Sequence, residues 1–128
     1  LIVFVDDEPD LVGLVADAVT LTLPTYRFVG TTSLQEAATQ LEDVPNERIA
    51  LLVADHQMGE NSGVELIEAM RSRGVIAPMI LYTGYAPPDI EKRAQAANAT
   101  ILWKPQRLKT LLHAVRRAID IGAPCPGA

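Results

Sequence analysis

Five short apolar runs alternate along the chain with longer segments in which apolar residues recur every three or four positions. A short apolar run bounded by turn-forming residues is typical of a buried strand, and the longer period is typical of a helix that packs on one side. The predicted strands cover residues 1–5, 26–29, 49–54, 78–82 and 100–103. This regular alternation of five strands with five helices predicts an α/β fold, a parallel sheet with helices on both faces.

Capping signals mark the ends of several predicted helices. Ser33 and Ser62 each precede a glutamate by three positions, which is the spacing of a capping box. Gly74 can take the left-handed conformation that ends a helix, and Arg71 and Arg73 lie where positive charge complements the helix dipole. The buried stripes expected for the first and last helices consist of Leu11, Leu14, Val15, Ala18 and Val19, and of Leu108, Leu111, Leu112, Val115 and Ile119.

The size and composition are those of one soluble globular domain. A chain of 128 residues with 48% apolar and 21% charged residues can bury a core, and its apolar runs are too short to span a bilayer. We expect residues 122–128 to be a Pro/Gly-rich tail or linker. The net charge of −5, without a run of Lys or Arg, argues against direct nucleic-acid binding. Cys125 is the only cysteine, which excludes an internal disulfide and suits the cytoplasm.

Polar side chains follow four of the five predicted strands. Asp6 and Asp7 come after the first, Asp55 after the third, Thr83 after the fourth and Lys104 after the fifth. In an open parallel sheet the ligand site lies outside the carboxyl ends of the strands, so we expect these groups to meet. Neighbouring carboxylates repel each other unless a cation lies among them, and Mg²⁺ is the usual ion for oxygen ligands. An ammonium and a hydroxyl would complete a site for a transferred phosphoryl group, with a carboxylate as nucleophile.

In these features the chain resembles the receiver domains of response regulators in two-component signalling. The resemblance covers essentially all 128 residues, with residues 1–121 as the receiver domain, and rests on Asp6-Asp7, Asp55 followed by Met58 and Gly63, Thr83-Gly84, and Lys104-Pro105. It implies a flavodoxin-like, doubly wound sheet with strand order 2-1-3-4-5. It also implies that Asp55 accepts a phosphoryl group from a histidine kinase or phosphotransfer protein, while Thr83 and Lys104 contact the phosphoryl oxygens.

The resemblance further implies a Mg²⁺ ion and no other cofactor. Asp7 and Asp55 would bind the ion directly, the backbone carbonyl of Gln57 would complete the protein ligands, and Asp6 would act through water. Such a domain is a switch and not a turnover enzyme, and it changes its affinity for a fused output domain, another partner or a second copy. We therefore expect a cytoplasmic phosphoprotein of a phosphorelay that contacts neither nucleic acid nor membrane directly.

Two positions depart from the family pattern, and two others bear on the lifetime of the phosphoryl group. Ile101 stands where an aromatic residue usually swings inward after phosphorylation. Trp103 cannot replace that aromatic, because it lies on the same strand face but next to the lysine. Gly59 replaces a proline that usually makes the following loop rigid. Gln57 and Tyr85 flank the expected approach of hydrolytic water, so a bulky Tyr85 is expected to slow loss of the phosphoryl group.

Each site residue also has an ordinary structural explanation. Single aspartates at such places commonly cap helices, and a threonine at a strand end commonly bonds the nearby backbone, so only the joint set favours a functional site. His56 follows Asp55 directly but is expected to point away from it in an extended segment. His113 is expected at the surface of the last helix.

Two other functions stay open. One is a receiver fold used as a phosphorylation-independent binding or dimerisation module, which Ile101 and Gly59 favour. The other is a small Mg²⁺-dependent phosphohydrolase that uses Asp55. Gln57 counts against the phosphohydrolase, because it stands where a second acid would be needed as the general acid.

Overall fold

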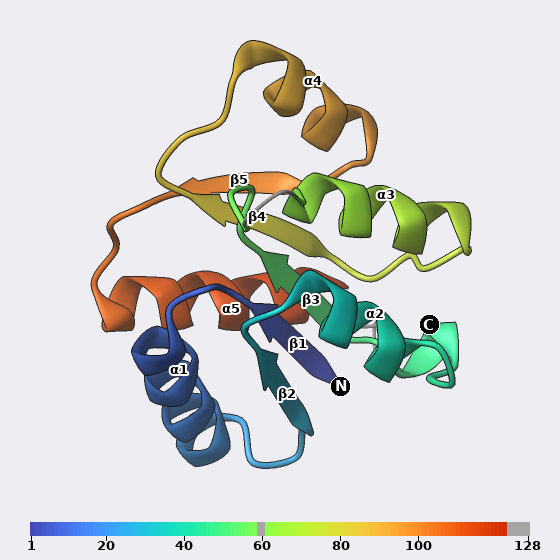
Figure 1. The fold of residues 1–128 in the computed structure, drawn as a ribbon. Helices are drawn as coiled ribbons and strands as arrows, with labels where there is room; N and C mark the ends of the chain where they lie inside the picture. Colours follow the sequence, from blue (N-terminus) through green and yellow to red (C-terminus); the bar gives the residue numbers. More distant parts are fainter. Residues whose placement is uncertain (59–60, 123–128) are drawn as a thin grey trace.

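The computed structural model describes residues 1–58 and 61–122. Within these ranges five parallel strands form one sheet in the order β2-β1-β3-β4-β5, and helices follow the strands in alternation (Figure 1). The strands are β1 (Ile2–Val5), β2 (Phe28–Thr31), β3 (Leu51–Ala54), β4 (Met79–Thr83) and β5 (Thr100–Trp103). The helices are α1 (Pro9–Thr22), α2 (Leu34–Leu41), η1 (Asn46–Arg48, a short 3₁₀ helix), α3 (Gly63–Ser72), α4 (Pro88–Ala96) and α5 (Leu108–Gly122). The predicted fold class and strand order are confirmed.

Some of the positions discussed above lie outside the described residues. They are Gly59, Cys125 and residues 123–128 of the predicted tail. Helix α5 continues through Gly122, which is the first residue of that tail. None of the helices in the described ranges is long and apolar enough to cross a membrane.

Helices cover both faces of the sheet. α1 and α5 lie on one face, and α2, α3 and α4 lie on the other (Figure 1). Because successive strand residues point to opposite faces, Ile2 and Phe4 of β1 join the core under α1 and α5, while Val3 and Val5 join the core under α2, α3 and α4. All four side chains are buried. A strand covered on both faces must be apolar throughout, which explains the uninterrupted apolar runs of the sequence.

The predicted second strand is placed too early. β2 begins at Phe28 instead of Tyr26 and continues to Thr31. Phe28 is the residue that pairs with Ile2, and its ring stacks on that of Phe4 with the centroids 6.5 Å apart. The register of β2 is therefore set by its pairing with β1, and this pairing cannot be predicted from the local sequence.

The predicted buried stripe of α1 is wrong at Leu14. Its side chain is 55% exposed, whereas Val15 and Val19 are fully buried and Leu11 and Ala18 are half-buried against the same core. One residue turns a helix by about 100°, so Leu14 is carried away from the face centred on Val15. A large apolar side chain thus lies on the surface of α1.

The predicted helix ends are present. Ser33 Oγ accepts a hydrogen bond from the N–H of Glu36 (3.2 Å), and Ser62 Oγ accepts one from the N–H of Val64 (3.3 Å). Gly74 has a φ of 99°, the left-handed conformation that glycine adopts without a steric penalty. The start of α2 and both ends of α3 therefore follow from local sequence.

Arg71 and Arg73 do more than complement the dipole of α3. The Arg71 guanidinium donates hydrogen bonds of 2.7–3.1 Å to four backbone carbonyls, those of Val75, Ala77, Ala97 and Asn98. Arg73 donates to Asn46 Oδ1 (2.7 Å) and to the carbonyls of Leu41 and Val44. These contacts lie at the amino edge of the sheet, where the strands begin. They tie the end of α3 to the segments that follow α2 and α4.

Candidate functional site

The predicted site residues lie together at the carboxyl edge of the sheet, where the strands end. Asp6 follows β1, Asp55 follows β3, Thr83 is the last residue of β4 and Lys104 follows β5. The backbone ladder continues past the strand ends, because Asp55 donates its N–H to Val5 (3.1 Å) and Lys104 donates its N–H to Thr83 (2.9 Å). Parallel neighbours thus deliver these side chains to one place.

Burial distinguishes these residues from ordinary loop residues. Among the described residues the buried polar side chains are those of Asp6, Thr31, Asp55 and Thr83, and three of the four belong to the predicted site. Asp7, by contrast, is exposed. A buried carboxylate is costly unless it is paired, so the surroundings of Asp6 and Asp55 must supply positive charge.

Lys104 supplies that charge. Its ammonium nitrogen lies 2.7 Å from Asp6 Oδ2 and 2.9 Å from Asp55 Oδ2, and it donates a hydrogen bond to the latter. The same nitrogen lies 5.2 Å from the centroid of the Tyr82 ring, within the range of a cation–π contact. Lys104 therefore joins the ends of β1, β3 and β5 through one charge.

The pKa values reflect this pairing. Burial by itself would lower the pKa of Lys104, but the contacts with Asp6 and Asp55 outweigh it, and the pKa is raised well above the ordinary value. The pKa of the Asp6 carboxyl is also raised, chiefly by burial and further by the charge of Asp55. Lys104 and the N–H of Glu8 oppose that rise without cancelling it. One lysine does not fully compensate this buried carboxylate.

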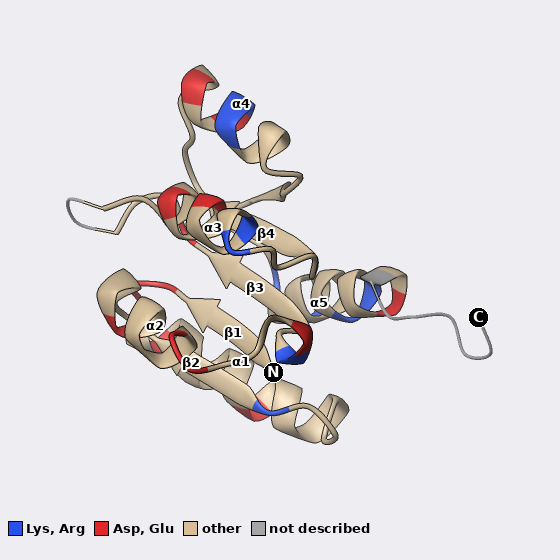
Figure 2. Cartoon of the chain, turned by 90° about the vertical axis from the view of Figure 1, so that its right-hand side faces the viewer, with Lys and Arg blue, Asp and Glu red and all other residues tan. Residues whose placement is uncertain are grey.

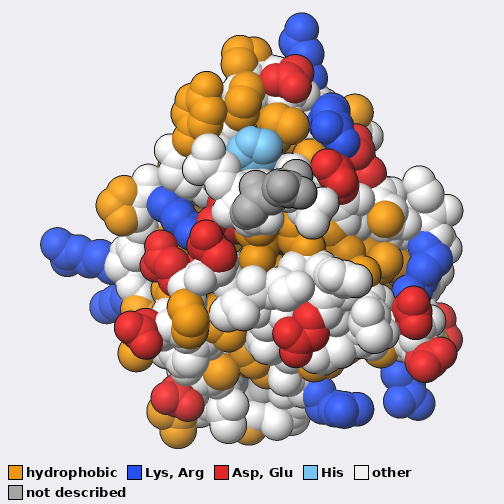
Figure 3. All heavy atoms as spheres, in the orientation of Figure 1, with side chains coloured by type: hydrophobic (Ala, Val, Ile, Leu, Met, Phe, Trp, Pro, Cys, Tyr) orange, Lys and Arg blue, Asp and Glu red, His pale blue; other side chains and the backbone are white. Residues whose placement is uncertain are grey.

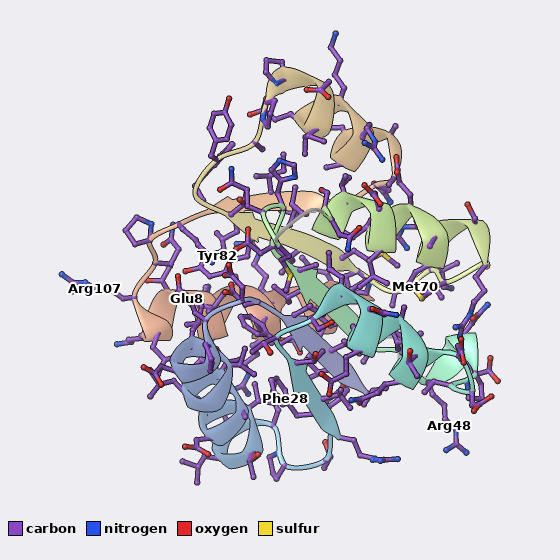
Figure 4. The ribbon with its side chains drawn as sticks, in the orientation of Figure 1. Glu8, Phe28, Arg48, Met70, Tyr82 and Arg107 are labelled. Atoms are coloured by element: carbon purple, nitrogen blue, oxygen red, sulfur yellow. The ribbon has the colours of Figure 1, made fainter. Side chains whose placement is uncertain are left out.

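The acids after β1 fit a divalent cation. Asp6 Oδ2 is buried, its 2.7 Å ion pair with Lys104 is poorly aligned for a hydrogen bond, and no other donor reaches it among the described residues. Carboxylate oxygens of Asp6, Asp7 and Glu8 lie within 4.8 Å of one another. Figure 3 shows acidic side chains on this side of the molecule among others spread over the same face, and Figure 4 labels Glu8 there. A buried, incompletely paired carboxylate beside two exposed carboxylates is an oxygen-only donor set of the kind that Mg²⁺ uses.

Two of the predicted metal ligands, Asp55 and the Gln57 carbonyl, are not part of the cluster formed by Asp6, Asp7 and Glu8. Asp55 instead accepts hydrogen bonds at both oxygens, from the N–H of Gln57 at Oδ1 (3.2 Å) and from Lys104 at Oδ2. The roles of Asp55 and of the Gln57 carbonyl as ligands stay predictions. Glu8, which the sequence reasoning did not assign to the site, joins Asp6 and Asp7.

The loop after Asp55 packs tightly against it. A Cβ atom at Gly63 would lie 2.1 Å from the carbonyl oxygen of Asp55, and backbone cannot move aside as a side chain can. Glycine is therefore required eight residues after the carboxylate. Met58 is buried in the core, as a packing role requires, and His56 Nδ1 lies 2.7 Å from Ser62 Oγ. His56 thus interacts with the cap of α3.

The hydroxyl of Thr83 is committed to its own loop. Thr83 is fully buried, and its Oγ1 donates to the carbonyl of Tyr85 (2.9 Å) and accepts from the N–H of Tyr85 (3.3 Å). This is the local backbone bonding expected of a threonine at a strand end. A contact between this hydroxyl and a phosphoryl oxygen requires that the hydrogen bond to the Tyr85 carbonyl be given up. The side chain of Tyr85 is 58% exposed.

Tyr82 is a site residue that sequence reasoning missed. It is buried at the end of β4, its ring lies under the Lys104 ammonium, and its hydroxyl accepts a hydrogen bond from the N–H of Gln106 (3.2 Å). The available signal was an aromatic residue directly before Thr83, on the strand next to the lysine. Tyr82 holds both Lys104 and the loop that follows it.

The two residues near the usual aromatic position differ in exposure. Ile101 pairs with Leu81 and packs against the core under α2, α3 and α4, while Trp103 pairs with Thr83 and is 43% exposed. An aliphatic side chain held in the core cannot exchange with solvent as a swinging aromatic does. The position of Ile101 against the core is therefore consistent with the expected departure from the family pattern.

A doubly wound parallel sheet whose carboxyl edge pairs buried aspartates with a lysine defines a particular class of protein. The sequence pattern of the response regulator receiver domain matches residues 2–116. The chain therefore belongs to the response regulator receiver domain family.

Individual relatives agree with this assignment. The two-component response regulator PprB of Pseudomonas aeruginosa is 26% identical over 120 residues, which are 91% of this chain and 42% of that protein. The transcriptional regulatory protein GlrR of Escherichia coli is 27% identical over 124 residues, 96% of this chain and 27% of that protein. A CheY-like receiver domain from Methanospirillum hungatei superimposes with a TM-score of 0.78 at 21% identity, covering 94% of each chain. The chain thus spans less than half the length of the curated relatives.

Proposed function

We propose that Asp55 accepts a phosphoryl group, in a Mg²⁺-dependent step, from a phosphohistidine of a histidine kinase or phosphotransfer protein. The proposal is carried by one observation, the buried carboxylate of Asp55 held 2.9 Å from Lys104 beside the acids that follow β1. In the transfer, an Asp55 oxygen attacks phosphorus and the bond from phosphorus to the donor histidine nitrogen breaks. That nitrogen keeps the electron pair and takes up a proton.

Residues of this chain prepare the transfer. The N–H of Gln57 holds Asp55 Oδ1 and so orients the carboxylate, and Lys104 is placed to neutralise charge on the phosphoryl oxygens. Asp6 and Asp7 would hold Mg²⁺ with Asp55 and the Gln57 carbonyl. The ion supplies further charge neutralisation and orientation of the phosphoryl oxygens. Lys104 must loosen its contact with Asp55 as the new group arrives.

We further propose that the domain acts as a cytoplasmic switch and not as a turnover enzyme. After transfer, Thr83 exchanges the Tyr85 carbonyl for a phosphoryl oxygen, which frees the backbone of the loop before α4. This change alters affinity for an attached output module or a second copy. Support comes from the curated relatives, which are longer than this chain and are described as a response regulator and a transcriptional regulatory protein.

The alternative is a receiver fold that binds partners without phosphorylation. The half-buried Ile101 favours it, because the aromatic exchange expected after phosphorylation has no side chain to carry it. The intact pairing of Asp6, Asp55 and Lys104 counts against it, since a pure binding module has no need of a costly buried charge cluster.

Intact mass measured after incubation with acetyl phosphate, with and without Mg²⁺, decides between them. We expect a gain of one phosphoryl group that requires Mg²⁺ and is absent in Asp55→Ala. Asp43→Ala, which removes an exposed carboxylate at the amino edge, is the matched control and should gain the group normally. A native protein that is folded by circular dichroism and gains nothing in Mg²⁺ would favour the phosphorylation-independent module.

A further inference from the structure

Lys104 is set apart from other basic residues by its surroundings. The basic residues of α4 and α5 lie on the surfaces of these helices (blue in Figure 2), and Lys92, Lys109 and Arg116 among them are exposed. The side chain of Lys104 is only 16% exposed, and its ammonium lies between two carboxylates and an aromatic ring. These contacts hold the end of a side chain that is otherwise flexible.

The aromatic ring is that of Tyr82, and the register of the sheet places it next to Lys104. Tyr82 on β4 pairs with Leu102 on β5, and both pack in the core under α1 and α5. Residues two apart on a strand share a face, so Lys104 follows Leu102 on that face. The N–H of Lys104 donates to the carbonyl of Thr83, which extends the pairing to this point. Tyr82 and Lys104 are therefore diagonal neighbours on two paired strands.

The ring of Tyr82 is itself fixed in place. The residue is 3% exposed, and its hydroxyl accepts a hydrogen bond from the N–H of Gln106 (3.2 Å). Packing around a ring and a hydrogen bond at its far end together restrict its movement. The Lys104 ammonium thus lies over a rigid surface, 5.2 Å from the centroid of the ring.

The carboxylate contacts of Lys104 change during the proposed reaction, whereas the contact with the ring does not. A phosphoryl group on Asp55 displaces the ammonium from Asp55 Oδ2, and a cation held by Asp6 competes for the charge of that carboxylate. The face of an aromatic ring attracts a cation through its quadrupole. This attraction includes no hydrogen bond that must be broken and no proton that could be transferred. The ring is therefore suited to hold the ammonium throughout the exchange.

We propose that Tyr82 is a positioning residue for phosphoryl transfer, because the face of its ring keeps the Lys104 ammonium beside Asp55 while the other contacts of that ammonium are exchanged. Tyr82 acts through Lys104 and takes no part in the chemistry itself. An aliphatic residue such as Ile80, which packs in the same core, would fill the space but would not attract the charge. The inference rests on the proposed role of Asp55 as phosphoacceptor.

Fluorination of the ring tests the proposal. Fluorine draws electrons from the face of the ring and so weakens its attraction for a cation, with little change in size. Tyr82→Phe, Tyr82→Leu and the replacement of Tyr82 by mono-, di- and trifluorophenylalanine are compared. The rate of phosphoryl gain from acetyl phosphate in Mg²⁺ is measured by intact mass against time, for variants that circular dichroism shows to be folded.

The rates should follow the electron density of the ring and not its size. We expect Tyr82→Phe to react within about twofold of the native rate, and Tyr82→Leu to react about tenfold more slowly. The fluorinated rings should give a stepwise fall that reaches about fivefold for trifluorophenylalanine. In the Lys104→Met background the fluorinated rings should all react at one rate, because the ring then has no cation to attract.

Phe4 is the matched control, because it is a buried aromatic residue of β1 in the same core. Trifluorophenylalanine in place of Phe4 should leave the rate unchanged. An equal fall at Phe4 would overturn the proposal, since the effect would then not depend on the contact with Lys104. A stepwise fall that persists in Lys104→Met would overturn it for the same reason.

Three results at position 82 would also overturn the proposal. They are a native rate in folded Tyr82→Leu, equal rates across the fluorinated rings, and a Tyr82→Phe variant as slow as Tyr82→Leu. The last result would assign the effect to the hydrogen bond with Gln106. A native chain that gains no phosphoryl group would remove the proposed function and this inference with it. If the native chain does gain the group, a failure within the ring series concerns the role of Tyr82 alone.

Discussion

At the amino edge of the sheet, Arg71 donates hydrogen bonds to four backbone carbonyls, whereas at the carboxyl edge Asp6 Oδ2 has a poorly aligned contact with Lys104 and no other donor within the described ranges. Figure 4 shows the two regions on opposite sides, with Glu8 and Tyr82 at the carboxyl edge and Arg48 at the amino edge. Both edges hold charged groups close to backbone. At the carboxyl edge, Asp55 accepts hydrogen bonds at both oxygens, and the group left incompletely paired is Asp6.

The difference separates a structural use of charge from a functional one. The amino edge gives each carbonyl a partner and so fixes the ends of α2, α3 and α4. The carboxyl edge places the acids after β1 and Asp55 around one lysine, which leaves negative charge in excess and solvent access through the exposed Asp7 and Glu8. The repulsion among these carboxylates lowers the stability of the folded protein, and it is relieved when a cation and an incoming group bind.

Loss of an amino-edge contact should have the largest effect on stability and little effect on chemistry. Arg71→Ala leaves four carbonyls without their charged donor and should lower the free energy of unfolding by about 3 kcal/mol. Arg93→Ala, which removes only the half-exposed pair with Glu68, should cost under about 1 kcal/mol. Urea unfolding measures both. Phosphoryl gain by folded Arg71→Ala should be normal, and its loss would show that the two edges are not separable.

Removal of the Lys104 charge should have its main effect on the chemistry. Lys104→Met should slow phosphoryl gain from acetyl phosphate about 100-fold, equal to about 2.7 kcal/mol of transition-state stabilisation. Lys92→Met, on the exposed surface of α4, should react at the native rate. The rates come from intact mass against time in Mg²⁺. Equal rates for Lys104→Met and the native chain would assign Lys104 a structural role like that of Arg71.

The excess negative charge predicts a stabilising substitution. Because the pKa of Asp6 is raised in the folded state, its contribution to stability is present at low pH and is lost as pH rises through the folded pKa. Without Mg²⁺ at pH 7, the free energy of unfolding of Asp6→Asn should therefore be about 1 kcal/mol higher than that of the native chain. The gain should shrink as pH falls toward 4.

The matched control for Asp6→Asn is Asp43→Asn, which changes an exposed acid. It should leave stability nearly unchanged at every pH. Addition of Mg²⁺ should stabilise the native chain but not Asp6→Asn, because the amide carries no negative charge to attract the ion. Denaturant titrations at several pH values, with and without Mg²⁺, measure these differences. A lower stability for Asp6→Asn at pH 7 would mean that Lys104 compensates Asp6 fully.

The smallest effect is expected at the rim of the carboxyl edge. If Tyr85 shields the phosphorylated Asp55 from water, Tyr85→Ala should shorten the lifetime of the phosphoryl group by about threefold. Tyr85→Phe keeps the ring and should retain the native lifetime. The decay is followed by intact mass after removal of the donor. An unchanged decay in Tyr85→Ala would remove the shielding role.

The carboxyl edge was more accessible to sequence reasoning than the amino edge. A parallel sheet brings its strand ends to one place, so Asp6, Asp55, Thr83 and Lys104 could be grouped from order alone, and the structure does bring them together. The contacts of Arg71 depend on carbonyls up to 27 residues away, and any residue supplies a carbonyl. Sequence patterns therefore contain no signal for such a partner.

Details that depend on packing were also beyond the sequence. The stacking of Lys104 over Tyr82 and the start of β2 at Phe28 are set by neighbouring strands. The commitment of Thr83 to the Tyr85 carbonyl was foreseen only as the ordinary alternative to a functional role. Apolar spacing grouped Leu14 with the buried stripe, although a single step around the helix exposes it.

The position of Trp103 gives this domain a built-in optical probe. It is the only tryptophan of the chain, it lies partly exposed directly before Lys104, and it is paired across the sheet with Thr83. Indole fluorescence changes in intensity and wavelength with the polarity and charge around the ring. Emission from the unlabelled protein should thus report cation binding and rearrangement of the β4 end in real time, in a single cuvette.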